Sequence, residues 1–96
     1  MLQSPTHRAL PDGVTPYRRT PVFDQDSLPA ALRHHHQTKT GVWGVIHVLE
    51  GRLAYTTLEP PTEQVLVPDA PGIVQPGQLH KVTPLGDVRF FVEFHR

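Results

Sequence analysis

From Gly41 to His95 the chain is a series of short apolar segments, separated by turn residues and rich in β-branched and aromatic side chains. Segments of this length and composition, with apolar and polar residues on alternate sides, are typical of β-strands. Many short strands at near-regular spacing predict an all-β sandwich or barrel. The expected strands span residues 42–49, 52–58, 64–67, 72–75, 79–83 and 87–95.

The connections between these strands can also be predicted. Glu50-Gly51 is a turn sequence between two strand-like segments, so we expect 42–49 and 52–58 to form a hairpin. Residues 59–63 contain two consecutive prolines, which cannot lie in a central strand, and they are expected to form a loop. In the last strand, alternation separates one set of side chains from another: Phe90, Val92 and Phe94 on one face, and Phe91, Glu93 and His95 on the other.

The N-terminal part of the chain is different in character. Residues 1–20 are polar and contain three prolines, which indicates an extended arm preceding a domain at 21–96. Residues 21–24 are expected to form a short edge strand. Residues 27–32 are expected to form one helical turn, with Asp26 or Ser27 as its N-cap.

Composition limits the functions that are open to the chain. A length of 96 residues suits one domain. Nine basic residues balance nine acidic ones, so no strong field attracts nucleic acid or an anionic membrane. No segment approaches the roughly 20 apolar residues of a membrane span, and a cytoplasmic protein is expected. Cysteine is absent, so any metal must be held by imidazole and carboxylate groups.

Seven histidines are present, and one of them follows a recognisable turn. Pro76-Gly77-Gln78-Leu79-His80 resembles the second metal-binding motif of the cupins, in which a histidine lies three residues after a glycine turn. Glu50-Gly51 is similar to the turn that ends the first cupin motif. The paired histidines and the glutamate that usually precede that turn are absent, since Gln37–Thr40 and Trp43-Gly44 occupy their places.

Five fragments in order resemble one branch of the cupins, the TehB/YeaR-like family associated with tellurite resistance. The resemblance covers the chain from about Pro16 to the end and implies a small cupin barrel, a jelly roll of β-strands. The family also occurs fused to a methyltransferase domain. These 96 residues contain no glycine-rich segment suited to S-adenosylmethionine, so methyltransferase activity is not expected. The fragments are 36–44, 48–51, 72–76, 80–85 and 89–94.

Three residues are candidate metal ligands, two of them, His36 and His80, suggested by the resemblance and the third, Glu93, by its place in the last strand. His36 and His80 match family histidines, whereas Glu93 is a carboxylate in an otherwise apolar strand and needs a partner or solvent. Two imidazoles and one carboxylate suit a divalent transition metal, with zinc, iron, nickel or manganese as the alternatives. Lys39 could bind an anionic ligand beside the metal, and Trp43 could line the cavity.

Other interpretations of these residues remain open. His36 could belong to a solvated loop, and Glu93 could pair with a basic residue on an exposed face. The first functional hypothesis is a stress-related metal-binding cupin that holds a small ligand or oxyanion in the barrel mouth; whether it is an enzyme is open. The alternative is a ligand-sensing or dimerisation module without metal. A homodimer is expected through an apolar face with Trp43, Val45 and His47.

Overall fold

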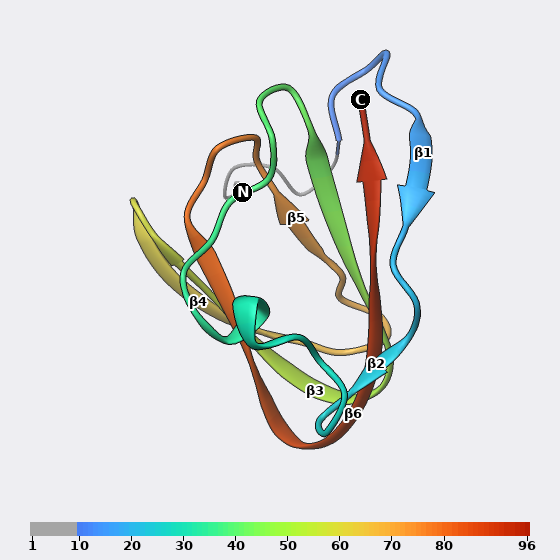
Figure 1. The fold of residues 1–96 in the computed structure, drawn as a ribbon, viewed down its shortest axis with the longest axis vertical. Helices are drawn as coiled ribbons and strands as arrows, with labels where there is room; N and C mark the ends of the chain where they lie inside the picture. Colours follow the sequence, from blue (N-terminus) through green and yellow to red (C-terminus); the bar gives the residue numbers. More distant parts are fainter. Residues whose placement is uncertain (1–9) are drawn as a thin grey trace, which may run out of the picture.

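The computed structural model describes residues 10–96, and the regular secondary structure of this part of the chain is almost entirely β-strand (Figure 1). Its strands form one antiparallel sheet, which confirms the predicted all-β domain. No helix in the described range is long and apolar enough to cross a membrane. The elements are β1 (Pro16–Arg19), β2 (Phe23–Asp24), the 3₁₀ turn η1 (Ala30–Arg33), β3 (Trp43–Leu58), β4 (Pro61–Leu66), β5 (Gly72–Val74) and β6 (His80–His95).

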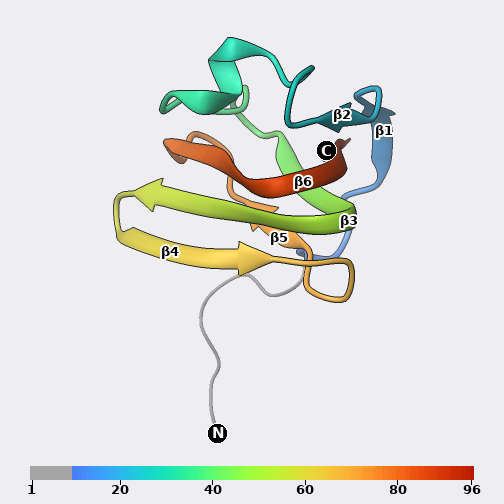
Figure 2. The same ribbon diagram turned by 90° about the horizontal axis from the view of Figure 1, so that it is seen from below.

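Two long strands organise the fold. β3 and β6 have 16 residues each and pair from Trp43 opposite His95 to Thr57 opposite His80. β1 and β2 extend the C-terminal half of β6, while β5 and β4 pair with the first and second halves of β3. Both long strands bend sharply, descending one side of Figure 1 and climbing the other. The sheet therefore folds over on itself into two layers, seen from below in Figure 2.

The predicted hairpin at Glu50-Gly51 is wrong, because β3 continues through it. Gly51 has a φ of 81° and the register of β3 against β6 shifts on both sides of it, so the strand bends without reversing. Gly86, with a φ of 95°, lies in the corresponding bend of β6. A Cβ at Gly51 would collide with the carbonyl of Asp87, which shows how closely the bends pack. The predicted break between strands 79–83 and 87–95 is wrong for the same reason.

The chain reverses after β3 at Glu59-Pro60, a cis peptide bond, and not before it. Pro61 already pairs with Leu58, so the predicted loop at 59–63 is largely strand. β4 lies at one end of the sheet order β1-β6-β3-β4. Proline is tolerated there because an edge strand leaves one side of its backbone unpaired.

The N-terminal segments depart from expectation in detail. Residues 16–19, placed in the arm by the sequence, pair with β6 as β1; residues 1–9 of that arm lie outside the described range. The helical turn begins after Pro29, which has an extended ψ of 145°, and is not capped by Asp26 or Ser27. Instead the Asp24 carboxylate accepts hydrogen bonds from the backbone N–H groups of both residues.

The core lies between the two layers and follows the predicted alternation of β6. Phe90 is fully buried, and its ring packs edge-on against Phe23 with centroids 5.8 Å apart. Buried side chains from the other strands complete the cluster: Ile46, Leu53, Leu66, Val74 and Val88 have less than 2% of their area exposed. The face of β6 with Phe90 therefore points inward, and the face with Phe91 and Glu93 points outward.

Candidate ligand-binding site

His36 and His80 lie against each other at one end of the interior. Their backbones form an isolated β-bridge with two hydrogen bonds of 2.9 Å, and their ring centroids are 4.2 Å apart. The turn at Gly77, whose φ is 74°, directs the chain into β6 so that its first side chain faces inward. The structure thus brings together two of the three suggested metal ligands.

Both imidazoles are held by backbone carbonyls. The Nδ1 of His36 is 3.2 Å from the carbonyl oxygen of His34, and the Nδ1 of His80 is 3.0 Å from that of Gln78. A carbonyl can only accept, so each Nδ1 carries the proton. Burial lowers the pKa of His80 to about 4, although its bond to Gln78 acts in the opposite direction. At pH 7 His80 is therefore neutral, with a lone pair on Nε2.

The two histidines border a small cavity of about 50 Å³, which we call the inner cavity. Four of its lining residues carry polar side chains: Thr20, His36, Thr38 and His80. The remaining lining residues are Leu32, Gly44, Ile46, Val74, Val82, Phe90, Val92 and Phe94. A space of this size holds a water molecule or one small chemical group.

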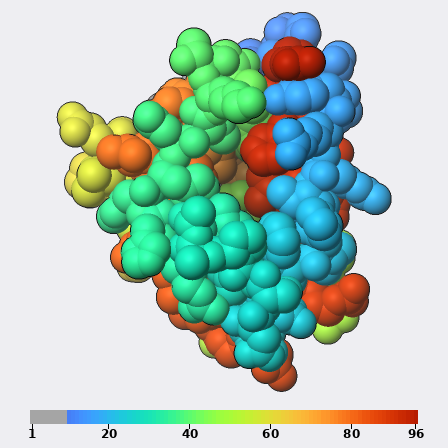
Figure 3. Space-filling model, viewed as in Figure 1, coloured from blue at the N-terminus to red at the C-terminus, as the bar shows by residue number. Residues whose placement is uncertain are grey.

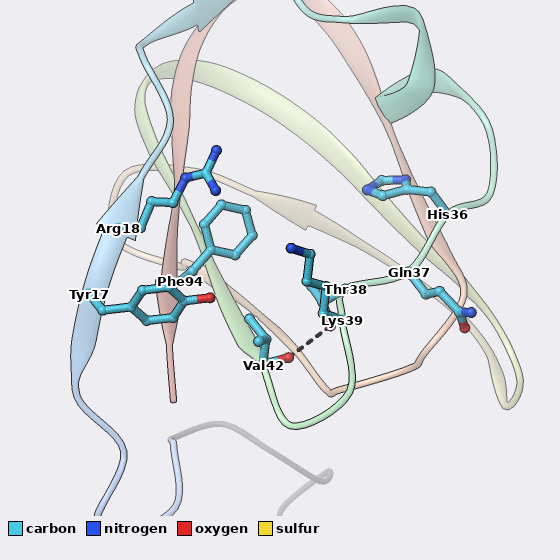
Figure 4. Close-up of a pocket in the computed structure, with 8 residues that line it drawn as sticks. All are labelled: Tyr17, Arg18, His36, Gln37, Thr38, Lys39, Val42 and Phe94. Atoms are coloured by element: carbon cyan, nitrogen blue, oxygen red, sulfur yellow. Dashed lines mark hydrogen bonds between the residues drawn. The ribbon is translucent and has the colours of Figure 1, made fainter.

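A larger cavity of about 240 Å³, the outer cavity, adjoins the first. The two share His36, Thr38 and Phe94 as lining residues. Figure 4 shows Arg18 from β1, Phe94 from β6 and Lys39 from the loop before β3 directed into one space, with His36 on the opposite wall. In the space-filling view this face is hollowed between the blue N-terminal segment and the green segment that precedes β3 (Figure 3). The other lining residues are Tyr17, Gln37 and Val42.

The outer cavity is electropositive. Within residues 10–96 neither Arg18 nor Lys39 forms an ion pair with an acidic side chain. Phe94 and the buried Val42 supply apolar walls. Lys39, which the sequence suggested as a contact for an anionic ligand, is one of the residues that line this cavity.

Glu93 is on the opposite face of the sheet, away from both histidines. Its Oε1 lies 2.9 Å from Nε2 of His95 and 3.3 Å from Nε2 of His47. Burial acts to raise the pKa of Glu93, but the hydrogen bonds from His95 and His47 outweigh it and hold that pKa below its usual range. Among residues 10–96, no three His, Asp or Glu side chains are grouped so that they could hold a metal ion. The suggested trio of His36, His80 and Glu93 does not converge.

Trp43 also lies away from the two cavities. It pairs in register with His95 at the outer face, and neither cavity includes it among its lining residues. Conversely, Arg18 was missed by sequence reasoning because a four-residue edge strand is too short to show alternation. Thr38 could have been found, since it lies two residues after His36 in the string that carried the resemblance.

Comparison with known proteins identifies the family to which this chain belongs. The model of the TehB-like domain matches residues 18–92, most of the described chain. The chain belongs to the TehB-like family. Two relatives are the probable S-adenosyl-L-methionine-dependent methyltransferases TehB from two strains of Haemophilus influenzae, 33% and 32% identical over 76 residues. The match covers 74% of this TehB-like chain and only 27% of each relative.

Solved structures agree with this family assignment. The crystal structure of TehB from Haemophilus influenzae superposes with a TM-score of 0.78 at 31% identity, covering 85% of this TehB-like chain and 31% of that one. A protein from E. coli strain K12 superposes with a TM-score of 0.84 over 100% of this chain and 97% of its own. Identity to the E. coli protein is 21%, so this likeness shows a shared fold alone.

Proposed function

We propose that this TehB-like domain is a cupin-type binding module that holds a small anionic ligand in its outer cavity. The observation that carries the proposal is the pair of cations, Arg18 and Lys39, directed into one cavity without an acidic partner in the described chain. Two like charges beside an apolar wall repel each other, and an anion between them removes that repulsion. Apolar walls with a few placed polar groups are typical of small-molecule sites.

The size and charge of the outer cavity limit the kinds of ligand that it can hold. A cavity of about 240 Å³ is below the usual range for drug-sized molecules, so the ligand is small. Small carboxylates satisfy this chemistry, as do oxyanions such as tellurite, which the likeness to tellurite-resistance proteins suggests. The methyltransferase activity named for the relatives belongs to proteins more than three times as long as the matched segment, and we do not extend it to these residues.

Calorimetric titration with acetate, phosphate, selenite and tellurite tests the proposal. We expect binding of at least one anion at low ionic strength, weakened by salt. Lys39→Met should weaken it about tenfold or more, because a charge-assisted contact contributes about 1.5–3 kcal/mol. Lys81→Met is the matched control, since Lys81 lies in β6 and lines neither cavity. Equal loss in both variants, or no anion binding at all, would refute the site.

A divalent metal at His36 and His80 is a second candidate, favoured by their hydrogen bonds. Metal-ligating histidines usually donate the other ring N–H to a carbonyl or carboxylate, as both do here. Such an ion, whether zinc, iron, nickel or manganese, would add positive charge beside the anion. Because Glu93 is on the other face, water or the ligand must complete the coordination. Metal analysis of protein purified without chelator or nickel resin tests this; metal-free protein, or content unchanged in His80→Ala, would exclude it.

The homodimer remains a proposal, and the face expected to form its interface exposes less apolar area than the sequence suggested. Val45 is 6% exposed and His47 contacts Glu93, which reduces the exposed apolar area on the face that also carries Trp43. Light scattering over a wide concentration range checks this, and a persistent monomer would reject the dimer. A cytoplasmic location likewise stays an expectation.

A further inference from the structure

The polar side chains of the inner cavity have all given their hydrogens to the backbone. The hydroxyl of Thr20 donates to the carbonyl of Pro21, and that of Thr38 donates to the carbonyl of Val42, both at 2.8 Å. The Nδ1 groups of His36 and His80 donate to carbonyls two residues earlier in the chain. All four polar side chains of the inner cavity therefore already donate a hydrogen bond to a backbone carbonyl.

What remains to these groups is the ability to accept hydrogen bonds. A neutral imidazole that donates through Nδ1 has a lone pair on Nε2, and a hydroxyl that donates once retains lone pairs on its oxygen. The Thr20 oxygen already accepts from the N–H of Val92. Within residues 10–96 the Nε2 atoms of His36 and His80 make no hydrogen bond. The inner cavity is thus an acceptor site with apolar walls.

The outer cavity has the opposite character, since Arg18 and Lys39 are donors with full positive charge. A ligand that occupies both cavities must place its anionic group beside these cations. It must direct a hydrogen-bond donor toward Nε2 of His36 or His80. A second carboxylate would be repelled by the lone pairs, and an ammonium group would lie beside the same two cations. A neutral hydroxyl can donate to the imidazoles without either repulsion, and the inner cavity of about 50 Å³ is large enough to hold it.

We propose that the ligand of this domain is a small hydroxycarboxylate, with its carboxylate in the outer cavity and its hydroxyl donating into the inner cavity. The inference rests on the anion site proposed above and names the class of anion that the site selects. A ligand that displaces water from this acceptor without offering a donor leaves the hydrogen bond unmade, so the site discriminates against the same acid without its hydroxyl.

The test compares pairs of acids that differ by one hydroxyl: glycolate with acetate, and lactate with propionate. The whole chain is first treated with a chelator and exchanged into chelator-free buffer, so that hydroxy acids cannot bind through a metal. Calorimetry should give affinities about tenfold tighter, or more, for the hydroxylated member of each pair.

Two variants separate the cavities. His80→Phe retains a ring but removes one of the two imidazole acceptors from the inner cavity, so the preference for the hydroxyl should fall. It should disappear when His36→Phe is added, while acetate binding persists. Lys39→Met alters only the outer cavity and should weaken both members of a pair by the same factor. Equal affinities within each pair for the unaltered protein would overturn the hydroxycarboxylate inference and leave the anion site standing. Failure of every anion to bind would overturn the anion site itself.

Long-range ¹H–¹⁵N NMR of the unaltered protein tests the inference even if His80→Phe fails to fold. The spectrum at pH 7.5 should show bare Nε2 and protonated Nδ1 atoms for both His36 and His80. Lactate should shift the Nε2 resonance of at least one of them, and propionate should not. A proton on Nε2 of both residues in the free protein would overturn the proposed acceptor site.

Discussion

Gly51→Ala should destabilise the domain far more than Gly77→Ala, although the two glycines have similar backbones. Their φ angles are 81° and 74°, both in the left-handed region that L side chains avoid. Adding a Cβ in that region costs about 1–2 kcal/mol. At Gly77 the new Cβ would have no neighbour in the described chain within 4 Å, so this backbone term is the whole expected loss.

At Gly51 the same Cβ meets another strand. It would overlap the carbonyl of Asp87 and lie 3.0 Å from the Cα of Val88, and both of these are backbone atoms in the bend of β6. Backbone cannot rotate away as a side chain can, so β3 and β6 must separate locally. Overpacking of this kind adds about 1–3 kcal/mol, for a total of roughly 2–5 kcal/mol. A domain of this length is stable by only about 5–14 kcal/mol.

Urea unfolding followed by the fluorescence of Trp43, the single tryptophan of the chain, measures both losses. We expect a much lower midpoint for Gly51→Ala than for Gly77→Ala, with similar dependence of the unfolding free energy on urea. Losses that agree within about 0.5 kcal/mol would place Gly51 in an open turn, as in a hairpin. That result would refute the continuous strand β3 and the packed bend.

Three further outcomes follow from the two faces of β6. Phe90→Ala should reduce the free energy of unfolding by about 3–5 kcal/mol and Phe91→Ala by about 1 kcal/mol, because only Phe90 is fully buried. Thermal unfolding measures both losses, and a larger loss for Phe91→Ala would contradict the assignment of Phe90 to the core face of β6. His80 should make stability fall as pH decreases from about 6.5 to about 4, since the unfolded state takes up the proton first. The loss is up to about 3 kcal/mol, and urea midpoints at pH 7 and 4.5 should show it. If stability changed with pH in the same way in His80→Phe, His80 would not be the cause. Glu93→Gln should leave anion affinity within about twofold of the original by calorimetry; a larger loss would place Glu93 in the site.

The sequence predicted the strands better than their connections. β-branched and aromatic runs marked almost every strand, because that signal is local to each segment. The bend at Gly51 could not be predicted in the same way, since a glycine with positive φ serves equally in a turn and at a corner. Which of the two forms depends on whether another strand lies opposite, here the Asp87 bend of β6. Pro61 was misassigned because its place at a sheet edge is also a tertiary property.

Glu93 lies apart from His36 and His80 because its side chain is on the outer face of β6. Alternation had already put Glu93 on the side opposite Phe90 and Phe94. Once the Phe90 side is known to be the core, Glu93 must point outward, where His47 and His95 contact it. Family strings and turn context marked His36 and His80, and Lys39 was suggested by its position; all three line the cavities, and their roles stay predictions. Arg18 reaches the outer cavity only through the pairing of β1 with β6, which no local pattern encodes.

The bend and the site depend on each other. His80 begins β6 and Phe94 lies near its end, yet both line the inner cavity, because the bend folds one half of the strand over the other. His36 is held there in turn by its backbone bridge to His80. Opening the corner at Gly51 should therefore displace the two halves and weaken anion binding. This is expected even for Gly51→Ala protein that is still folded, whereas folded Gly77→Ala should bind normally. Unimpaired binding by folded Gly51→Ala would show that the cavities form without the closed corner.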